Sequence, residues 1–373
     1  NIANAGAPDR AKAINAASES IVSGRLVVIP TETVYGLAGS AATSEAPDLL
    51  SAIPGGAPRP FAWHIHSLEL LREIMRPSFP VHRRLLNRLL PGPVTFQIDL
   101  SSIKLGRIRE RAGAAPGTID DHGVLAIRIP DHPVAREILE SAWKRGHPVV
   151  AQGAAGLGAA WADASRVPTN WQPGTATGGL SVVVDAGPTR YRRPSTTIRL
   201  LADGGYRIVA EGALEARMVR KQLERTVLFV CTGNTCRSPM AAAIARHLAA
   251  ELPPGVTTRF ISGGTAADAG SPASNETIAA IESLGIDAGS LQTHRSRELT
   301  RQMLAEAEVV FAMTAAHARA AMSIDPSAAD KIRILDPEGR DVPDPIGGSR
   351  EVYTRTAERL KDLIQRRLRE LDA

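Results

Sequence analysis

The most constraining feature of this sequence is a short apolar run that ends in a cysteine and leads into a helix. Residues 226–230 read Thr-Val-Leu-Phe-Val, which is typical of a strand buried on both faces of a parallel sheet. Cys231 and a short polar loop follow, and residues 240–250 then have the composition of a helix. A strand, a loop and a helix at this spacing predict one unit of a doubly wound sheet, with the loop at the carboxyl end of the strand.

Strand-like and helical segments alternate along the chain, which predicts α/β architecture throughout. Five further apolar runs are expected to be strands: residues 25–29, 94–100, 123–129, 148–151 and 180–185. Residues 69–76, 134–144 and 212–224 are expected to be helices, and residues 167–179, rich in Pro, Gly and Thr, a loop. We therefore expect an open twisted sheet with helices in the first part and a doubly wound, mainly parallel sheet in the second.

The length of 373 residues favours two domains, because a single core rarely grows beyond about 250–300 residues. The expected helix at residues 212–224 runs into the buried strand at 226–230, where the α/β pattern starts again. We place the boundary near Leu223, which divides the chain into domains 1–222 and 223–373.

The composition favours a globular protein of the cytoplasm. No apolar run approaches the roughly 18 residues of a membrane span, so no membrane contact is expected. The two cysteines, Cys231 and Cys236, are too few for a disulfide scaffold and fit a reducing compartment. A formal charge of +5 is small for this length and only hints at an anionic partner such as phosphate or nucleic acid.

The segment that follows the buried strand has the chemistry of a phosphate-binding loop with a nucleophile. Backbone N–H groups of such a loop point inward at a helix N-terminus, and Gly233 is expected to allow a turn that a side chain would obstruct. Arg237 can hold two phosphoryl oxygens at once, while Ser238 and Pro239 suit the N-cap and first helical position. The positive field of the loop N–H groups and of Arg237 is expected to lower the pKa of Cys231 from about 8.5 to roughly 3.5–7.5.

A thiol nucleophile also needs an acid that protonates the leaving group. Asp344 is the candidate, because the flanking prolines Pro343 and Pro345 stiffen a loop that can reach over the pocket. An Asp-Pro turn without a catalytic role is the alternative interpretation of this segment. Its pairing with the cysteine loop favours the acid, and no metal is expected.

From Val227 to its C-terminus the sequence resembles the low-molecular-weight protein tyrosine/arginine phosphatase family. The specific motifs are Cys-Thr-Gly-Asn-Thr-Cys-Arg-Ser-Pro-Met at residues 231–240, the distal Asp-Pro pair, and the stretches at residues 262–265, 294–297 and 312–314. The resemblance implies that Cys231 is the nucleophile and forms a phosphocysteine, that Arg237 clamps the phosphate, and that Asp344 acts first as acid and then as base.

The resemblance also implies which residues support the phosphate loop. Asn234 would brace the loop and Ser238 would donate a hydrogen bond to the thiolate. The remaining supporting residues are Thr232, Gly233, Thr235 and Cys236. Two interpretations of Cys236 stay open, a protective disulfide with the nucleophile and a small buried filler. No cofactor is implied for the phosphatase.

Two positions bear on the substrate, which we expect to be a phosphorylated protein. Tyrosine-directed members of the family usually carry Ile where this chain has Thr235, and aromatic residues after the Asp-Pro pair, where this chain has Ile-Gly-Gly-Ser at 346–349. A polar threonine suits a planar phosphoguanidinium, and the missing aromatics remove the walls that would hold a phenyl ring. The sequence favours phosphoarginine, with phosphotyrosine as the alternative.

Residues 10–220 resemble a second family, the threonylcarbamoyl-adenylate synthases (YrdC-like), which activate threonine with bicarbonate and ATP for a tRNA modification. The specific motif is Pro-Thr-Glu-Thr-Val-Tyr-Gly at residues 30–36, with further matches at 91–95, 126–130 and 194–197. The resemblance implies a ligand site with six residues of this chain: Thr31, Thr33, Tyr35, Arg59, Ser195 and Thr196.

The first domain departs from this second family where phosphates should bind. Ile53 and Gly55 stand in place of a Lys-x-Arg pair, and Gly153 and Ala155 in place of Ser-x-Asn. ATP chemistry depends on neutralising phosphate charge, so we expect a degenerate domain in which ATP is doubtful, although Arg59 could partly replace a lost cation. The alternatives are a bifunctional enzyme that still makes threonylcarbamoyl-AMP, and a module that binds tRNA or a nucleotide without chemistry.

Overall fold

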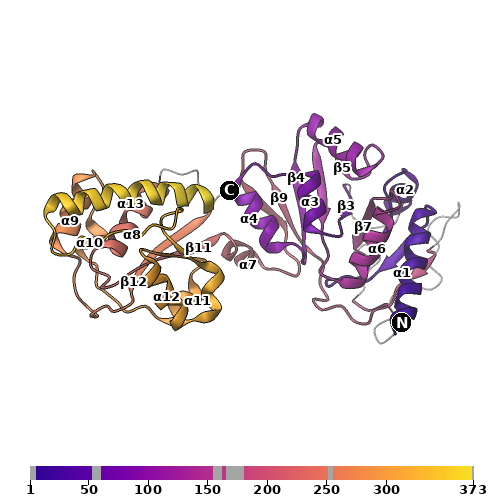
Figure 1. Cartoon of the computed structure of the whole chain (residues 1–373). Coiled ribbons are helices and arrows are strands. Elements are labelled where there is room, and N and C mark those ends of the chain that lie inside the picture. Colours follow the sequence, from indigo (N-terminus) through magenta and orange to yellow (C-terminus); the bar gives the residue numbers. More distant parts are fainter. Residues whose placement is uncertain (1–5, 53–59, 154–161, 165–179, 251–254, 372–373) are drawn as a thin grey trace. The chain divides into compact units, whose positions relative to one another are not determined.

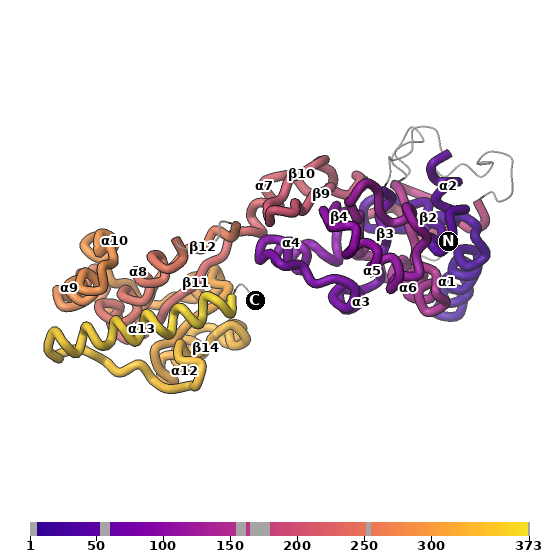
Figure 2. The backbone as a smooth tube through the Cα atoms, turned by 90° about the horizontal axis from the view of Figure 1, so that it is seen from above, coloured from indigo at the N-terminus to yellow at the C-terminus, as the bar shows by residue number. Residues whose placement is uncertain are grey.

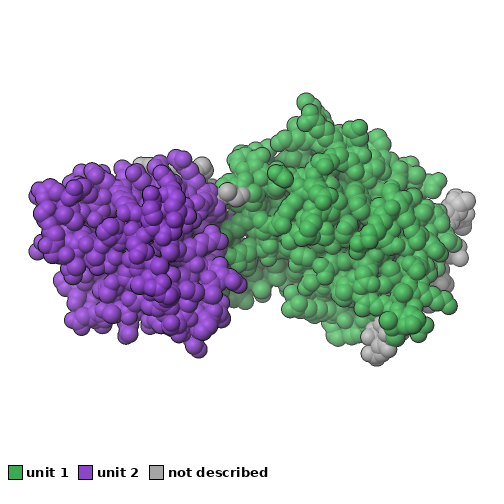
Figure 3. Space-filling view, in the orientation of Figure 1, with its two compact units in different colours: residues 1–222 green, residues 223–373 purple. Residues whose placement is uncertain are grey.

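The computed structural model describes residues 6–52, 60–153, 162–164, 180–250 and 255–371. The chain divides into two compact units, residues 1–222 and residues 223–373 (Figure 3). Within the described residues, no helix combines the length and the apolar character needed to cross a membrane.

The first unit is built on one large mixed sheet (Figure 1). Its strand order is β10-β9-β4-β6-β3-β7-β2-β1-β8, and β5 pairs with β6. Three pairs are parallel, β3 with β6, β4 with β9 and β1 with β8, and the others are antiparallel. The strands are β1 (Val27–Ile29), β2 (Gly36–Ser40), β3 (Ala62–His64), β4 (Val94–Asp99), β5 (Asp120–Asp121), β6 (Val124–Arg128), β7 (Val149–Gly153), β8 (Val182–Val183), β9 (Thr196–Leu200) and β10 (Tyr206–Ala210).

Helices cover this sheet and close its core. They are α1 (Ala7–Val22), α2 (Glu45–Ser51), α3 (Leu68–Ile74), α4 (Pro80–Leu89), α5 (Ser102–Ala112), α6 (Pro133–Trp143) and α7 (Ala216–Lys221). Helices α1 and α6 lie side by side (Figure 2). Buried residues of these helices, such as Ile21 and Ile138, pack with Val27 and Val149 of the sheet. The open twisted sheet with helices that the sequence predicts is confirmed.

All five strands predicted for the first part exist, whereas the sequence does not predict β2, β3, β5, β9 and β10. Strand β2 reads Gly-Leu-Ala-Gly-Ser, a composition poor in β-formers, and it is a strand because β1 and β7 pair with it on both sides. A Cβ on Gly39 would lie 2.5 Å from the Cβ of Ala46, so the glycine lets α2 pack close. The helix predicted at 212–224 is only α7, and the loop predicted at 167–179 lies outside the described residues.

The second unit is a doubly wound parallel sheet, as the sequence predicts. Its strand order is β12-β11-β13-β14, and all its described pairs are parallel. The elements are β11 (Glu224–Cys231), α8 (Arg237–Ala250), β12 (Thr257–Gly264), α9 (Asn275–Ser283), α10 (Gly289–Gln292), α11 (Arg301–Glu306), β13 (Val309–Ala312), α12 (Ala315–Ile324), η3 (Pro326–Lys331), β14 (Ile332–Ile334) and α13 (Arg350–Leu371).

Alternate residues of β11 enter two separate cores. Val227 and Phe229 pack in the layer that holds α8 and α13, whereas Leu228 and Val230 pack with residues of α11 and α12. A strand covered on both faces must be apolar at successive positions, which is why the run at 226–230 could be recognised in the sequence.

Candidate active site

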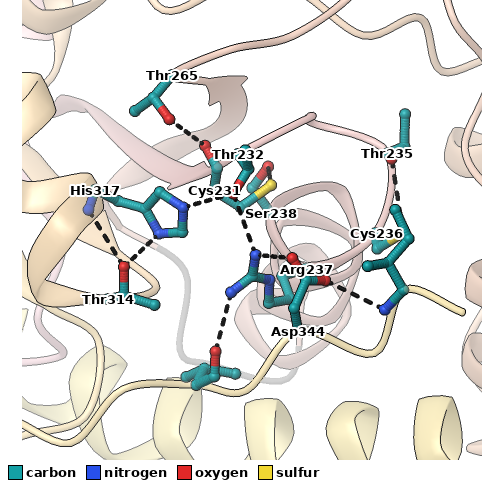
Figure 4. Close-up of polar contacts among 12 residues, drawn as sticks. Cys231, Thr232, Thr235, Cys236, Arg237, Ser238, Thr265, Thr314, His317 and Asp344 are labelled. Atoms are coloured by element: carbon teal, nitrogen blue, oxygen red, sulfur yellow. Dashed lines mark hydrogen bonds and ion pairs between the residues drawn. The ribbon is translucent and has the colours of Figure 1, made fainter. Parts of the chain in front are cut away.

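The order of the strands places the cysteine loop at the point where the connections of the second unit's sheet change side. Strand β11 lies between β12 and β13 and ends at Cys231, while α8 begins at Arg237. The connections from β11 and β13 leave the sheet on opposite sides, and ligands of open parallel sheets bind at such a point. The loop of residues 232–236 therefore sits where phosphate binding is expected (Figure 4).

Helix α8 starts three residues earlier than the sequence predicts, which changes the role of Ser238. Ser238 and Pro239 lie inside the first helical turn, where proline is tolerated, and not at an N-cap and first position. The Ser238 hydroxyl instead lies 3.0 Å from the Cys231 sulfur. It also accepts a hydrogen bond from Asn234 Nδ2 at 2.9 Å and lies 3.3 Å from the carbonyl of Gly263.

The sequence predicts that Gly233 makes the turn of the loop, but in the structure Asn234 makes it. Its φ is 56°, in the left-handed region that asparagine tolerates better than most residues. A Cβ on Gly233 would meet only Thr235 Oγ1, at 3.6 Å, so a side chain would not obstruct the backbone there. Asn234 Oδ1 accepts the N–H of Arg297 at 3.0 Å, and its carbonyl lies 2.7 Å from His294 Nε2. These contacts brace the loop from the segment that follows α10.

Gly264 belongs to the motif at residues 262–265, and the structure shows the steric role that the sequence did not reveal. A Cβ at this position would lie 2.4 Å from the carbonyl oxygen of Thr232 and 3.0 Å from the backbone N of Asn234. Gly264 ends β12, beside Cys231 in the parallel register. Only glycine lets the neighbouring strand approach the loop this closely.

Cys231 is buried, with 2% of its surface exposed. Burial raises the pKa of its thiol, and the Ser238 hydroxyl, the backbone N–H groups of Ser238 and Asn234, and the charge of Arg237 act in the opposite direction. The expectation of a lowered pKa is therefore wrong for this arrangement of the site. The physical reason is that the sulfur is desolvated by burial. In addition, an ion pair with a carboxylate partly neutralises the positive charge of Arg237.

That carboxylate is Asp344, which the chain brings into the site from 107 positions away. Its Oδ2 is paired with Nη2 of Arg237, whose Nη1 donates to the carbonyl of Val342 at 3.1 Å. The Arg237 side chain is 5% exposed and that of Asp344 40% exposed, so the carboxylate closes the site from the solvent side. The backbone N–H of Ile346 donates to Asp344 Oδ1 at 3.3 Å.

His317 belongs to the site but was not singled out in the sequence. Its Nε2 lies 2.8 Å from Thr232 Oγ1, and its Nδ1 lies 2.9 Å from Oγ1 of Thr314, the N-cap residue of α12. Burial lowers the pKa of His317 and the charge of Arg237 lowers it further, which favours the neutral imidazole. The available signal was the Ala-Met-Thr motif at 312–314, three residues before the histidine.

Cys236 points away from the solvent among hydroxyl groups. Its sulfur lies 3.6 Å from the Tyr353 hydroxyl, 3.6 Å from Thr235 Oγ1 and 3.7 Å from Ser274 Oγ. Both cysteines are free thiols in this structure.

The candidate residues of the first unit do not form one group. Thr31 and Thr33 lie together, with 2.9 Å between their hydroxyl oxygens, and Nη2 of Arg128 donates to Thr33 Oγ1 at 2.7 Å. The same nitrogen forms a buried ion pair of 2.8 Å with Glu32, so the cation of this cluster is matched by a carboxylate. Nearby His64 is buried, and desolvation together with Arg128 lowers its pKa to about 3, which makes it neutral at pH 7.

The other candidates of the first unit make contacts that stabilise loops. The Tyr35 hydroxyl donates to the carbonyl of Gly187 at 2.7 Å, and burial raises its pKa to about 12. Thr196 Oγ1 binds the backbone of residues 212 and 214 through three hydrogen bonds, whereas Ser195 Oγ lies 2.8 Å from Thr95 Oγ1. Arg59 lies outside the described residues, as do three positions where the family motif is lost: Ile53, Gly55 and Ala155.

A parallel sheet whose central strand ends in a cysteine, with an arginine at the following helix and a distal aspartate, defines a cysteine-dependent phosphatase. The family model described as "Low molecular weight phosphotyrosine protein phosphatase" matches residues 226–373, and the Sua5/YciO/YrdC model, described as "Telomere recombination", matches residues 19–212. The chain therefore belongs to the low molecular weight phosphatase family in its second unit and to the Sua5/YciO/YrdC family in its first.

The names of similar proteins agree with this assignment. A protein-arginine-phosphatase of Geobacillus stearothermophilus is 38% identical over 144 residues, which cover 38% of this chain and 91% of the relative. The protein-arginine-phosphatase of Bacillus subtilis is 34% identical over 149 residues, 39% of this chain and 95% of that protein. A probable low molecular weight protein-tyrosine-phosphatase, EpsP of Ralstonia solanacearum, is 34% identical over 122 residues, 32% of this chain and 78% of its own. The chain is a phosphatase of this family.

Proposed function

We propose that the second unit hydrolyses phosphoarginine in phosphorylated proteins, with Cys231 as nucleophile. The observation that carries this proposal is that Cys231, Ser238, Arg237 and Asp344 meet at one loop although they come from two distant segments. The loop offers an anion nest at a helix N-terminus and needs neither metal nor cofactor for the reaction described below.

In the first step the thiolate of Cys231 attacks phosphorus. An S–P bond forms as the P–N bond to the substrate guanidine breaks, and the protonated carboxyl of Asp344 donates its proton to the leaving nitrogen. Arg237 and the loop N–H groups stabilise the charge that spreads over the equatorial oxygens. The product of this step is a phosphocysteine and a free arginine side chain.

In the second step water attacks the phosphocysteine. The carboxylate of Asp344 takes a proton from the water, the S–P bond breaks, and inorganic phosphate and the thiolate are released. Because Asp344 is paired with Nη2 of Arg237, a phosphoryl oxygen must compete for that nitrogen. Substrate binding would therefore release Asp344 from Arg237 and strengthen the field of the arginine at the sulfur.

The residues around the loop support phosphoarginine as the substrate. Thr235 is half-buried at the loop and presents a hydroxyl, which suits a guanidinium better than a phenyl ring. Ile346, which follows the Asp-Pro pair, is 72% exposed and is succeeded by two glycines, so this segment offers no aromatic wall. Two of the most similar relatives carry the name protein-arginine-phosphatase.

The substrate assignment is tested with matched peptides that carry phosphoarginine or phosphotyrosine. The account predicts a higher kcat/KM on phosphoarginine for the wild-type chain. It also predicts that Thr235→Ile shifts the ratio of the two kcat/KM values toward phosphotyrosine by about tenfold or more, since one lost hydrogen-bonding group is worth roughly 1–2 kcal/mol. A wild-type chain that prefers phosphotyrosine would overturn the assignment.

We propose further that the first unit has lost synthase activity. Within the described part of this unit, the buried cluster of Thr31, Thr33, Arg128 and Glu32 carries no net positive charge, and His64 is neutral beside it. Such a cluster does not fit the phosphates of ATP, which require cations. We derive no step through ATP for this chain.

The alternative, a bifunctional enzyme, is distinguished by one assay. A chain that retains synthase activity consumes ATP only when both threonine and bicarbonate are present. We expect no such consumption above the level of an Arg128→Met variant. A salt-sensitive shift of tRNA without ATP consumption would instead support a nucleic-acid-binding module.

A further inference from the structure

A small polar cavity of about 170 Å³ lies in the second unit, behind the phosphate loop. Helix α8, strand β12 and the segment from α10 to residue 297 line it, and it is open to solvent on one side. Its polar lining consists of Arg246, Ser262, Ser290, Thr293, His294 and Arg297. The volume is below the roughly 300–1,000 Å³ of pockets for drug-sized ligands and suits a group of a few heavy atoms.

The cations of this cavity are held in place by neutral partners. Arg246 donates from Nη1 to the carbonyl of Phe260 at 3.0 Å and from Nη2 to Ser290 Oγ at 2.9 Å. Arg297 donates from Nε to the carbonyl of Ser262 at 2.9 Å. Among the described residues no carboxylate forms an ion pair with either arginine, and the cavity lining contains no acidic residue.

The electrostatics of the neighbouring groups agree with an uncompensated positive site. Partial desolvation lowers the pKa of Arg246, and no carboxylate counteracts it. Burial also lowers the pKa of His294, and three cations, Arg297, Arg246 and Arg295, lower it further. Two guanidinium groups that line one cavity, with hydroxyl groups beside them, offer the kind of donors that a phosphoryl group accepts from.

The cavity is connected to the catalytic loop through two residues that line it. His294 Nε2 lies 2.7 Å from the carbonyl of Asn234, and the N–H of Arg297 donates to Asn234 Oδ1 at 3.0 Å. Asn234 in turn donates to Ser238, which contacts the nucleophile. A ligand that orders His294 and Arg297 would therefore order the phosphate loop.

We propose that this cavity is a second binding site for a phosphoryl dianion, which acts on the catalytic loop through Asn234. The dianion comes either from free inorganic phosphate, the product of the reaction, or from a second phosphorylated side chain of the substrate. Binding of free phosphate at this cavity does not depend on the substrate proposed above. Binding of a second phosphorylated side chain does rest on that proposed function, because it requires a phosphorylated protein as the substrate.

Equilibrium dialysis of the full chain against radioactive inorganic phosphate tests the site directly. For dialysis, all variants are made in a chain that already carries Arg237→Met, because this substitution weakens phosphate binding at the catalytic loop. We expect that adding Arg246→Met removes one bound phosphate per chain or raises its Kd at least tenfold, and that Arg246→Lys, which keeps the charge, has a smaller effect. Unchanged phosphate binding in the Arg246→Met protein would overturn the proposal.

Arg301→Met is the matched control. Like Arg246, Arg301 is exposed and donates to a backbone carbonyl, that of Ile324, but it does not line the cavity. An equal loss of phosphate binding in Arg301→Met would mean a general effect of net charge and would also overturn the proposal. Turnover of p-nitrophenyl phosphate by each single variant shows that the second unit is folded.

Kinetics then distinguish the two sources of the dianion. If free phosphate is the ligand, inorganic phosphate inhibits the wild type in a mixed manner and inhibits Arg246→Met in a purely competitive manner. If the substrate supplies it, Arg246→Met raises KM for a doubly phosphorylated peptide and leaves KM for the singly phosphorylated peptide unchanged. No change in either measurement would contradict the connection to the loop. The inhibition by inorganic phosphate is measured with p-nitrophenyl phosphate as the substrate. The outcome of that measurement therefore does not depend on whether the enzyme prefers phosphoarginine.

Discussion

At the scale of single residues, the central question is how a buried sulfur becomes a nucleophile. Burial raises the pKa of Cys231, and Arg237, the cation that opposes burial, is paired with Asp344. The Ser238 hydroxyl and two backbone N–H groups supply the remaining stabilisation of the thiolate. The carboxylate that serves as acid in the first step therefore also controls how much of the arginine's field reaches the sulfur.

Replacing the acid should have two opposite effects. In Asp344→Asn the charge of Arg237 is no longer shared, so the pKa of Cys231 should fall, and alkylation by iodoacetamide should begin at lower pH than in the wild type. Turnover of phosphoarginine should nevertheless drop by about 10²–10⁴-fold, because the leaving nitrogen is not protonated. Turnover of p-nitrophenyl phosphate should drop less, since its leaving group is a stable anion.

The control for this prediction is Arg237→Met, which should raise the pKa of Cys231. A pKa that rises or stays constant in Asp344→Asn would show that the pair does not control the thiolate. An equal loss of turnover on both substrates would argue against the role of Asp344 as acid.

At the scale of elements, the shape of the loop depends on how closely the end of β12 approaches the turn that follows β11. Strand β12 ends at Gly264, where a side chain would collide with the backbone of Thr232 and Asn234. Asn234 accepts contacts from the segment after α10, and Thr232 contacts His317 of α12. Elements on both faces of the sheet therefore fix the shape of the loop.

A methyl group at Gly264 should distort the loop. Overpacking of this kind typically costs about 1–3 kcal/mol, so Gly264→Ala should increase hydrogen exchange at residues 231–238 by about 5- to 150-fold and weaken phosphate binding. The matched variant is Gly233→Ala, whose added Cβ meets only Thr235 Oγ1 at 3.6 Å and should leave hydrogen exchange close to the wild-type rate. Equal exchange rates in the two variants would contradict the steric argument.

The sequence predicted those parts of the site whose chemistry depends on spacing. Cys231 and Arg237 could be recognised because a loop of fixed length joins them between a buried strand and a helix. Asp344 could be recognised because two prolines flank it. Gly264 lies in the motif at residues 262–265, but its steric role could not be predicted. His317 could not be recognised either, since the partners of both residues become known only when β12 and α12 are placed beside the loop. Strand β2 was missed for a related reason, because its neighbours and not its own residues make it a strand.

At the scale of the whole molecule, the chain joins a phosphatase unit to a unit of a second family. The core of the first unit contains buried ionisable groups: Glu32, His64 and Arg128 are each less than 7% exposed. The ion pair of Glu32 with Arg128 keeps the cluster neutral, and His64 is kept uncharged by burial and by Arg128. A neutral buried histidine makes the stability of this unit depend on pH.

The sign of this dependence follows from the pKa of His64, about 3 in the folded unit against about 6.5 when unfolded. Between these values the unfolded state binds a proton that the folded state does not, so the free energy of unfolding should rise with pH from about 3 to 6.5. His64→Gln should reduce that slope. The slope should not vanish, because burial also lowers the pKa of His66 and His132.

Tryptophan fluorescence measures this unit selectively, because all 4 tryptophans of the chain precede residue 222. Urea unfolding at several pH values gives the slope for wild type and variants. The control is His122→Gln, since the His122 side chain is 93% exposed and should leave the slope unchanged. A wild-type unit that becomes more stable as the pH falls from 6.5 to 4 would contradict the assignment of a neutral His64.

The central claim is that Cys231 performs phosphatase chemistry on phosphoarginine. The most direct test is the release of inorganic phosphate from an arginine-phosphorylated protein by the wild-type chain and by Cys231→Ser. The account predicts release by the wild type, a loss of at least about 10³-fold in Cys231→Ser, and a transient phosphorylated peptide containing residue 231 when the wild-type chain is mixed rapidly with substrate and quenched. Comparable release by Cys231→Ser, or no release by the wild type from phosphoarginine while phosphotyrosine is hydrolysed, would contradict it.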